Sequence, residues 1–443
     1  MKGLLACTLC VALLAAVTPA ATAAVLPGFE RETTALGCPL GFTLLPGTIC
    51  PPSEQIDPDE AEADANAHPP PPGRAITGPA APYSAHSMIY SCCTPAAQKE
   101  RAFAAARASG AGYVRLDVNL RGVFAVRRGK PRRPDWTGLD RISRLARQYK
   151  LPVVAVLTHV PDHITQCQND NQRTCPAGDF EAYGRYAALI AERLAGVAPY
   201  FEIVNEPDGR WAFRGSPSEY ARMLEAAHRH IRTRVPTTRI LLGGLMYQDK
   251  KWITQMLETP GVDAIRKFEV ANVHLRGKAS RLGGSVKRWR EYFAKRGFRG
   301  QLWVTEHGYP GNTLFQYDRA FRGGEGAQAA FLGRSLPALR KAGARQVFVT
   351  LRDSWRSEFV GEYASEGVIN LGESSPFAVR RKPAFDVVTR FNARWRKAER
   401  LRTLRKRHLR AAARHKRAGR RAKAKKHRRL ARRYSLRAKR ISY

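Results

Sequence analysis

Short apolar runs alternate with longer segments of helical periodicity between about residue 86 and residue 395. The runs are rich in β-branched and aromatic residues and cover 87–90, 113–118, 152–159, 200–206, 239–245, 268–275, 302–306 and 346–351. The segments between them have the spacing of amphipathic helices, and one opens with Ser216 and Glu219 in a capping-box arrangement. Strands that alternate with helices predict βαβ units and a parallel sheet.

Eight strands with intervening helices over roughly 310 residues are typical of a (β/α)8 TIM barrel. A doubly wound open sheet is the alternative. It usually has fewer strands and a glycine-rich turn after the first one, and no G-x-G-x-x-G follows residues 87–90. We therefore predict an α/β fold with a (β/α)8 TIM barrel at 85–395, in which a last helix at about 382–395 covers the eighth strand.

The first 84 residues lack this alternation. Residues 1–23 have one Lys, an apolar run and small residues at the end, which is the pattern of a secretory signal peptide. An uncleaved membrane anchor is the alternative, but the apolar run at 4–17 is shorter than the roughly 20 residues that a span needs. We expect a secreted protein with an N-terminal extension at 24–84. Its second part, 51–84, has the composition of a Pro-rich acidic linker.

Cysteine usage agrees with export. Six cysteines follow the signal segment: Cys38, Cys50, Cys92, Cys93, Cys167 and Cys175. An even number of cysteines in an exported chain favours disulfide bonds over a metal site. Because short loops close most easily, we expect the bridges Cys38–Cys50 and Cys167–Cys175. The adjacent cysteines at 92 and 93 would then form a strained vicinal bond or stay free thiols.

The C-terminal tail at 396–443 carries much of the charge. The 443-residue chain has a formal net charge of +39, and residues 401–443 contain 20 Lys or Arg and no acid. Uniform positive charge repels itself, so we expect a disordered or only partly helical tail. In an exported protein such a tail predicts binding to an anionic envelope polymer, an acidic polysaccharide or a membrane surface. Few aromatic residues accompany the charge, which argues against nucleic acid. A solvated tail without a dedicated partner is the alternative.

Two of the eight runs end in a glutamate. The fourth run ends in EIVNEPD with Glu206, and the seventh ends in LWVTEHGYP with Glu306. Catalytic groups of TIM barrels lie at the C-terminal ends of the strands, and strands four and seven face each other across such a barrel. Both carboxyl groups are therefore predicted to share one mouth. Paired carboxyl groups are what the cleavage of a glycosidic bond requires.

The two motifs resemble the acid/base and nucleophile signatures of clan A glycoside hydrolases, the retaining (β/α)8 enzymes that include families 5 and 39. The resemblance covers roughly residues 87–395. It implies that Glu206 is the general acid/base, that Glu306 is the nucleophile, and that Asn205 contacts the sugar hydroxyl next to the anomeric carbon. It implies no metal and no other cofactor.

The resemblance and the ends of the other runs supply five further substrate-binding candidates: Arg115, His159, His274, Tyr309 and Trp355. Arg115 is expected to support the nucleophile, with Asp117 or another acid as its alternative partner. For the other candidates the alternative is packing or hydrogen bonding at the barrel rim. Relatives commonly have His-x-Tyr at the end of the sixth strand, where this chain has His274-Leu275-Arg276. The missing Tyr leaves the group that orients the nucleophile undefined.

The leading hypothesis is a secreted retaining glycoside hydrolase that cleaves a poly- or oligosaccharide by double displacement. Two carboxyl groups at the spacing of a retaining enzyme separate their pKa values, so that Glu206 is protonated and Glu306 ionised near neutral pH. One alternative is a sugar-binding protein on the same barrel without catalytic activity. The other is an envelope-associated protein whose function resides in a polyanion-binding tail.

Overall fold

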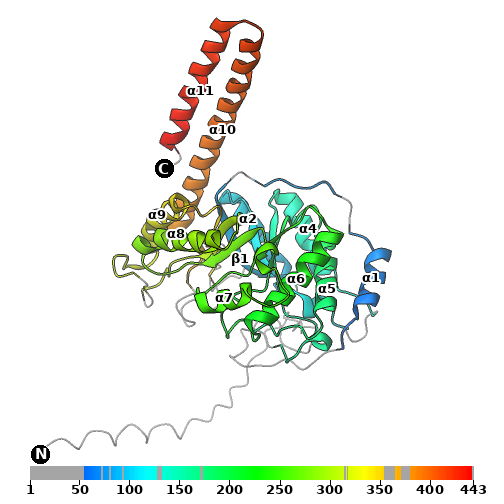
Figure 1. Cartoon of the computed structure of the whole chain (residues 1–443). Helices are drawn as coiled ribbons and strands as arrows, with labels where there is room; N and C mark the ends of the chain where they lie inside the picture. Colours follow the sequence, from blue (N-terminus) through cyan, green and yellow to red (C-terminus); the bar gives the residue numbers. More distant parts are fainter. Residues whose placement is uncertain are drawn as a thin grey trace, which may run out of the picture.

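Eight parallel strands form a closed barrel (Figure 1). The computed structural model describes residues 54–70, 73–78, 81–91, 94–126, 132–169, 173–313, 316, 318–353, 365–370 and 380–441. The strands are β1 (Tyr83–Tyr90), β2 (Val114–Asn119), β3 (Val153–Thr158), β4 (Tyr200–Ile203), β5 (Arg239–Leu242), β6 (Val270–His274), β7 (Gln301–His307) and β8 (Val347–Thr350). Each strand pairs with the next in sequence, and β8 pairs with β1 to close the ring. The predicted TIM barrel is therefore confirmed, and the open sheet is excluded.

Helices between the strands surround the barrel (Figure 1). They are α2 (Ala96–Ala108), α3 (Leu120–Val123), α4 (Thr137–Tyr149), α5 (Phe180–Arg193), α6 (Pro217–Arg234), α7 (Lys250–Leu257), α8 (Ala279–Lys295) and α9 (Gly324–Ala342). A short antiparallel pair, β9 (Ile369–Asn370) and β10 (Arg380–Arg381), follows β8. The predicted capping box opens α6: the backbone N–H of Glu219 donates to Ser216 Oγ, and that of Ser216 donates to the Glu219 carboxylate.

The barrel interior is built in layers of opposite character. A floor of apolar side chains is formed by Val154, Tyr200, Leu241, Val270, Trp303 and Phe348. Successive side chains of a strand alternate between the two faces of the sheet, so the next inward positions are two residues further on. On three strands these positions hold Glu202, Asn272 and Thr305, all fully buried. Apolar packing thus fills one end of the barrel, and the end at which the strands finish is polar.

The acidic segment that was expected to be a linker is docked on the barrel. It contains α1 (Pro58–Ala67), which packs against α5. The side chain of Ile56 is fully buried, and the hydroxyl of Tyr186 donates to its carbonyl oxygen. Glu62 pairs with Arg234 at 2.6 Å. Acidic side chains of the segment therefore meet arginines of the barrel helices, a complementarity that composition alone does not reveal.

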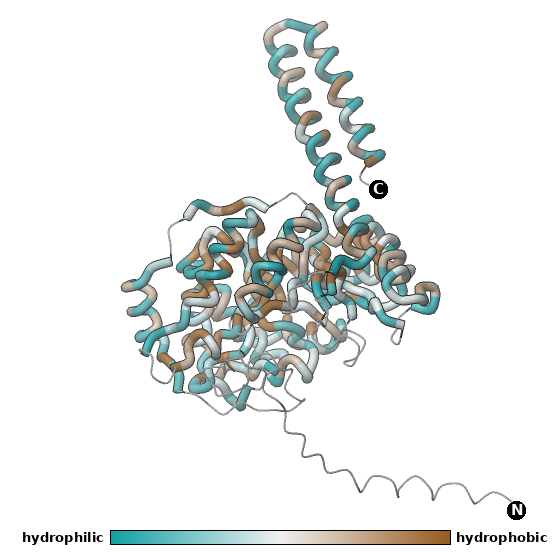
Figure 2. Tube along the Cα trace, turned by 180° about the vertical axis from the view of Figure 1, so that it is seen from behind, coloured by the Kyte–Doolittle hydropathy of each residue, from teal (hydrophilic) through white to brown (hydrophobic). Residues whose placement is uncertain are grey.

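The basic tail is helical, in contrast to the expected disorder. The last barrel helix begins as predicted but continues as α10 (Pro383–Arg417), and α11 (Arg421–Ile441) packs back against it. The two helices form a hairpin that projects from the barrel (Figure 1), with largely hydrophilic residues along both (Figure 2). Buried alanines along the hairpin are Ala398, Ala412, Ala424, Ala431 and Ala438. Small residues let two helices approach closely, so the cationic side chains can extend outward.

One of the two expected disulfides is present, between Cys167 and Cys175. The signal segment at 1–23, Cys38–Cys50, the cysteines at 92 and 93, and Trp355 lie outside the described residues. Within the described part of the chain, every helix is too short or too polar to cross a membrane.

Docking of the acidic segment gives the first prediction. Ile56→Ala should lower the free energy of unfolding by about 2–5 kcal/mol, because the fully buried side chain leaves a cavity. Urea unfolding followed by circular dichroism measures the change. Ala63→Ser on the exposed face of α1 is the control, with an expected effect within about 0.5 kcal/mol. A similarly small effect of both substitutions would show that the segment contributes nothing to stability.

Candidate active site

The two predicted carboxyl groups meet at the mouth of the barrel. Glu306 lies in β7, and Glu206 follows the end of β4. One carboxylate oxygen of each, together with a ring nitrogen of His274, lies within 4.8 Å of the others. Glu206 is 2% exposed and Glu306 is 8% exposed. The strand positions inferred from the sequence therefore bring the two acids into one largely buried site.

Backbone strain accompanies this arrangement. Four non-glycine residues near strand ends have positive φ angles: His159 (54°) after β3, Val204 (60°) and Glu206 (47°) after β4, and Gln248 (56°) after β5. This conformation is costly, above all for a β-branched residue such as Val204, and it persists where the surrounding structure enforces it. The kinked chain after β4 directs Glu206 toward Glu306.

Arg115 in β2 connects several groups of the site. Its Nε and Nη2 atoms donate to the two carboxylate oxygens of Glu202, at 2.9 and 2.8 Å. Nη2 also donates to Asn205 Oδ1 at 2.7 Å, and Nη1 donates to Glu306 Oε1 at 3.0 Å. Arg115 thus contacts the predicted nucleophile and also pairs with a buried acid. That acid is Glu202, which falls within the expectation of Asp117 or another acid.

His86 belongs to the same network, although the sequence interpretation missed it. Its Nδ1 lies 3.0 Å from Arg115 Nη1. A guanidinium can only donate, so Nδ1 accepts and the ring proton is on Nε2, which lies 3.5 Å from Glu306 Oε1. The first run was expected to begin at residue 87, but β1 begins at Tyr83 and includes His86. Extending the run N-terminally would have found it.

His274 ends β6 and contacts Glu206. Its Nδ1 lies 2.6 Å from Glu206 Oε1, and its Nε2 lies 3.1 Å from Thr305 Oγ1. The Thr305 hydroxyl donates to Asn272 Oδ1, so it accepts from Nε2–H. In a neutral ring Nδ1 then accepts a hydrogen bond from the protonated carboxyl group of Glu206. Gly244 permits this position, because a Cβ atom there would lie 2.0 Å from His274 Nε2.

Arg276 occupies the position at which the resemblance to clan A enzymes led us to expect Tyr. Its Nη2 donates to Glu306 Oε2 at 3.1 Å, and its Nε donates to Glu366 Oε1 at 3.0 Å. Glu366 is 1% exposed and follows β8. Together with Arg115, Arg276 gives each oxygen of Glu306 its own guanidinium donor. The group that orients Glu306 is therefore an arginine, and the departure from the His-x-Tyr pattern marked its place.

Two guanidinium groups keep Glu306 ionised. Burial alone would raise its pKa, but the charges of His274 and His86 when they are protonated, and the permanent charges of Arg115 and Arg276, outweigh burial and hold the pKa well below the usual value. Burial lowers the pKa of His86 to about 3 and that of His274 to about 4. Both rings are therefore neutral at pH 7, where the two arginines supply the positive charge.

Glu206 has the opposite environment. Burial raises its pKa well above the usual value, and the negative charge of Glu306 raises it further. Glu206 is therefore the acid that keeps its proton to higher pH, and Glu306 is the acid that ionises first. Within the described residues, Glu206 Oε2 is buried without a hydrogen-bond partner, so this oxygen can serve a ligand.

The oxygen and nitrogen atoms of Glu206, His274 and Glu306 could in principle hold a metal ion. Arg115 and Arg276, however, each place a guanidinium 3.0–3.1 Å from an oxygen of Glu306. These fixed positive charges repel a cation. The arrangement fits acid–base and nucleophilic chemistry better than metal binding.

Tyr309 does not lie where a sugar contact was expected. It is fully buried, and its hydroxyl donates to the carbonyl oxygens of Asp318 and Phe321 at 2.9 and 2.6 Å. Its ring stacks on Phe331 in α9 with a centroid distance of 4.3 Å. The side chain therefore stabilises the loop after β7, which was the alternative interpretation.

His159 lies at the end of β3 and is 6% exposed. Its backbone N–H donates to Thr174 Oγ1 at 3.2 Å, and its carbonyl oxygen accepts from the N–H of Arg121 at 3.0 Å. These contacts place His159 in the packing of the β3 loop. The roles expected for His159 and for Trp355 stay predictions.

Comparison with known proteins identifies similar folds. No protein-family model matches the chain, and no sequence among the curated proteins matches it. A variant of GH5_18 from Streptomyces cattleya, solved in complex with Manb1-4GlcNAc, has a TM-score of 0.53 at 17% identity over 72% of this chain and 81% of its own. The GH39 enzyme from Xanthomonas axonopodis pv. citri has a TM-score of 0.50 at 15% identity, over 72% and 68%.

The exo-beta-1,4-mannosidase Op5Man5 from Opitutaceae bacterium strain TAV5 has a TM-score of 0.50 at 20% identity over 73% of this chain. The chain spans 61% of the length of that mannosidase. At these identities the similarities concern the fold, and they agree with the closed barrel described above.

The charge arrangement gives the second prediction. Arg276→Met should raise the pKa of both glutamates, because the guanidinium lowers each of them. The rise for Glu306 should be about one pH unit or more. Carbon-13 NMR titration of labelled glutamate carboxyl groups measures it, and Arg281→Met on the exposed face of α8 is the control. An unchanged pKa of Glu306 would show that Arg115 alone holds the anion.

Proposed function

We propose that the protein is a retaining glycoside hydrolase of the clan A type, with Glu206 as general acid/base and Glu306 as nucleophile. The observation that supports this most directly is the approach of the two carboxylates, with one oxygen of each within 4.8 Å. Retaining enzymes place their carboxyl groups about 5–5.5 Å apart, whereas inverting enzymes need about 6.5–9.5 Å to accommodate a water.

In the first step Glu306 attacks the anomeric carbon and the glycosidic C–O bond breaks. Glu206 transfers its proton to the leaving oxygen, so the aglycone departs as a neutral alcohol. In the second step a water gives a proton to Glu206 and its oxygen attacks the anomeric carbon, which releases Glu306 as a carboxylate. Two displacements at the same carbon give net retention of configuration.

The pKa of Glu206 changes during this cycle for an electrostatic reason. In the free site, the negative charge of Glu306 raises the pKa of Glu206. Once Glu306 is a neutral ester, that contribution disappears and the pKa of Glu206 falls. Glu206 therefore stays ionised after it has given up its proton, and it can act as a base. In the free site the proton of Glu206 is shared with His274 through Oε1, and when a substrate binds it must be carried by Oε2, the oxygen without a hydrogen-bond partner within the described residues, which faces the leaving group and then the water.

Asn205 is oriented for a sugar hydroxyl. Its Oδ1 accepts from Arg115 Nη2, so its amide N–H groups are left to donate to a ligand. A donor beside the acid binds the hydroxyl next to the anomeric carbon. The substrate class that fits is a poly- or oligosaccharide. The structural neighbour from Streptomyces cattleya was solved with Manb1-4GlcNAc, a disaccharide.

Secretion is part of the proposal. It rests on the signal-like residues 1–23 and on the Cys167–Cys175 disulfide, since disulfides persist in oxidising compartments outside the cytosol. An extracellular location suits an enzyme that acts on polysaccharide.

The nucleophile assignment gives the third prediction. A 2-fluoro glycoside with a good leaving group should form a covalent ester on Glu306, detected as a peptide mass increase, after a screen of glycosides has found a substrate. Glu306→Gln should lower kcat by about a thousandfold or more, while Glu258→Gln, an exposed acid in the α7 loop, leaves it unchanged. No labelling and no turnover on any glycan would favour the non-catalytic sugar-binding alternative.

The acid/base assignment gives the fourth prediction. Glu206→Ala should lose activity on substrates with poor leaving groups, and azide should restore turnover with a glycosyl azide of retained configuration, identified by NMR. The wild-type kcat/KM should fall at high pH as Glu206 loses its proton. The pKa of Glu206, which is raised, determines the pH at which this alkaline limb of the pH profile begins. The variant should lack this alkaline limb. A persistent limb, or an azide product of inverted configuration, would contradict the assignment.

A further inference from the structure

A cationic cavity lies on the barrel, apart from the two glutamates. It has a volume of about 470 Å³, within the range of about 300–1,000 Å³ that is common for ligand sites. Residues that line it include Gly78, Arg107, Gly110, Lys150, Arg396 and Arg400. We call it the basic cavity.

The basic cavity lies at the end of the barrel where the strands begin. Arg107 is in the last turn of α2, just before β2, and Lys150 follows α4, just before β3. Glu206 and Glu306 lie at the opposite ends of the strands. Because TIM-barrel active sites occupy that opposite face, the basic cavity has no place in the hydrolytic reaction.

The four cations of the basic cavity have no acidic counterpart in it. Within the described residues, no carboxylate lies in ion-pair distance of Arg107, Lys150, Arg396 or Arg400. Arg396 Nη1 donates to the carbonyl oxygen of Gly110 at 3.0 Å. Burial, and then the charges of Arg107 and Arg400, lower the pKa of Arg396. An anion would relieve this mutual repulsion.

The backbone is shaped to admit the guanidinium of Arg396. Gly110 has a φ of 72°, and a Cβ atom there would lie 2.1 Å from Arg396 Nη1. Lys150 has a φ of 51°, unusual for a residue with a side chain. The two turns therefore bring α10 against the barrel with its cations directed into the cavity.

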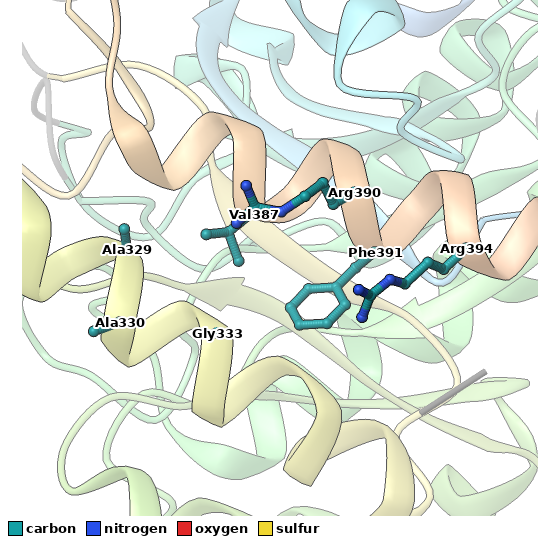
Figure 3. Close-up of a pocket in the computed structure, with 7 residues that line it drawn as sticks. All are labelled: Ala329, Ala330, Gly333, Val387, Arg390, Phe391 and Arg394. Carbon is teal, nitrogen blue, oxygen red and sulfur yellow. The ribbon is translucent and has the colours of Figure 1, made fainter. Parts of the chain in front are cut away.

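The basic cavity continues into the hairpin. Arg396 and Arg400 lie in α10, whose 35 residues make a helix about 50 Å long. Another cavity, of about 380 Å³, lies between α9 and α10 and includes Arg390 and Arg394 (Figure 3). Beyond residue 400 the helices carry 20 Lys or Arg and no acid. Positive charge is thus continuous from the barrel along the hairpin.

We propose that the basic cavity binds a phosphate group of an anionic polymer, and that further charges of the polymer contact the hairpin. Three arginines and a lysine suit phosphate, because a guanidinium donates two parallel hydrogen bonds to it. A polymer fits better than a membrane. In the described hairpin, Leu409 and Leu436 are the exposed large apolar side chains, whereas helices that lie in membranes have a wide apolar face.

The test compares two triple variants of the full-length protein, both built at exposed positions. The cavity variant carries Arg107→Gln, Lys150→Gln and Arg400→Gln. The control variant removes the same charge from the surface of α8 and the residues that follow it, by Arg281→Gln, Lys287→Gln and Arg299→Gln. Inorganic polyphosphate is the probe, and calorimetric titration at several salt concentrations gives Kd.

The cavity variant should bind polyphosphate at least about tenfold more weakly than the wild type at low salt, and the control variant less than about twofold more weakly. The slope of log K against log salt is negative, and its magnitude should be smaller by roughly two to three in the cavity variant. Inorganic phosphate should compete with polyphosphate on the wild type. Hydrolysis of a small glycoside should be the same in all three proteins, so this test is independent of the glycosidase assignment.

Equal losses in the two variants would overturn the proposal, because they would mean that overall charge, and no particular site, binds the polymer. Wild-type affinity of the cavity variant, or no competition by phosphate, would also overturn it. Vesicles that contain phosphatidylglycerol are the remaining arm. If they bound only proteins with an intact basic cavity while polyphosphate bound the wild type and the cavity variant equally, a lipid headgroup would be the ligand and the polymer would be excluded.

Discussion

The site depends on keeping two buried carboxyl groups in different protonation states a few ångströms apart. Two anions at that distance in a largely buried site would repel strongly, so one must hold a proton or both must have cationic partners. Here the cations are distributed unequally. Glu306 receives Arg115 on one oxygen and Arg276 on the other, and Glu206 receives a neutral imidazole from His274. The asymmetry of these partners defines which acid gives up its proton.

Strand geometry explains how such a polar site can be buried. Tyr200, Val270 and Trp303 belong to the apolar floor, and the residues two positions later on the same strands belong to the polar layer. Buried charges are tolerated when they are paired and hydrogen-bonded. Arg115 meets that condition with Glu202, to which it donates two hydrogen bonds. The packed apolar residues therefore fix the strands, and the strands hold the polar side chains at the other end of the barrel in place.

The barrel and the pair of glutamates could be predicted because they depend on periodicity. Alternating runs gave the eight strands, and the places of Glu206 and Glu306 on the fourth and seventh runs gave their proximity. His86 and Arg276 were not predicted as contacts of Glu306, because His86 precedes the expected start of the first run and Arg276 stands where the resemblance led us to expect Tyr. Glu202 could have been predicted as a buried partner of a cation, because it is a lone acid inside an apolar run.

Two of the differences from expectation, at the acidic segment and at the basic tail, have a common physical origin in contacts between segments. The acidic segment was interpreted from its composition, but α1 finds arginines on the barrel helices. The basic tail was expected to repel itself, but its alanines bring α10 and α11 together and its charges point to solvent. Tyr309 was placed by its distance from Glu306 along the chain, and its hydroxyl is engaged within its own loop. None of these partners is adjacent in sequence.

The clamp formed by Glu366 on Arg276 has a consequence for the order in which the protein matures. Glu366 comes after the last barrel strand, 90 positions beyond the arginine that it holds. A growing chain that already contains both glutamates still lacks Glu366, the carboxylate that fixes Arg276 against Glu306. The full set of contacts around Glu306 is therefore among the last features that the growing polypeptide acquires, after the strand that closes the ring.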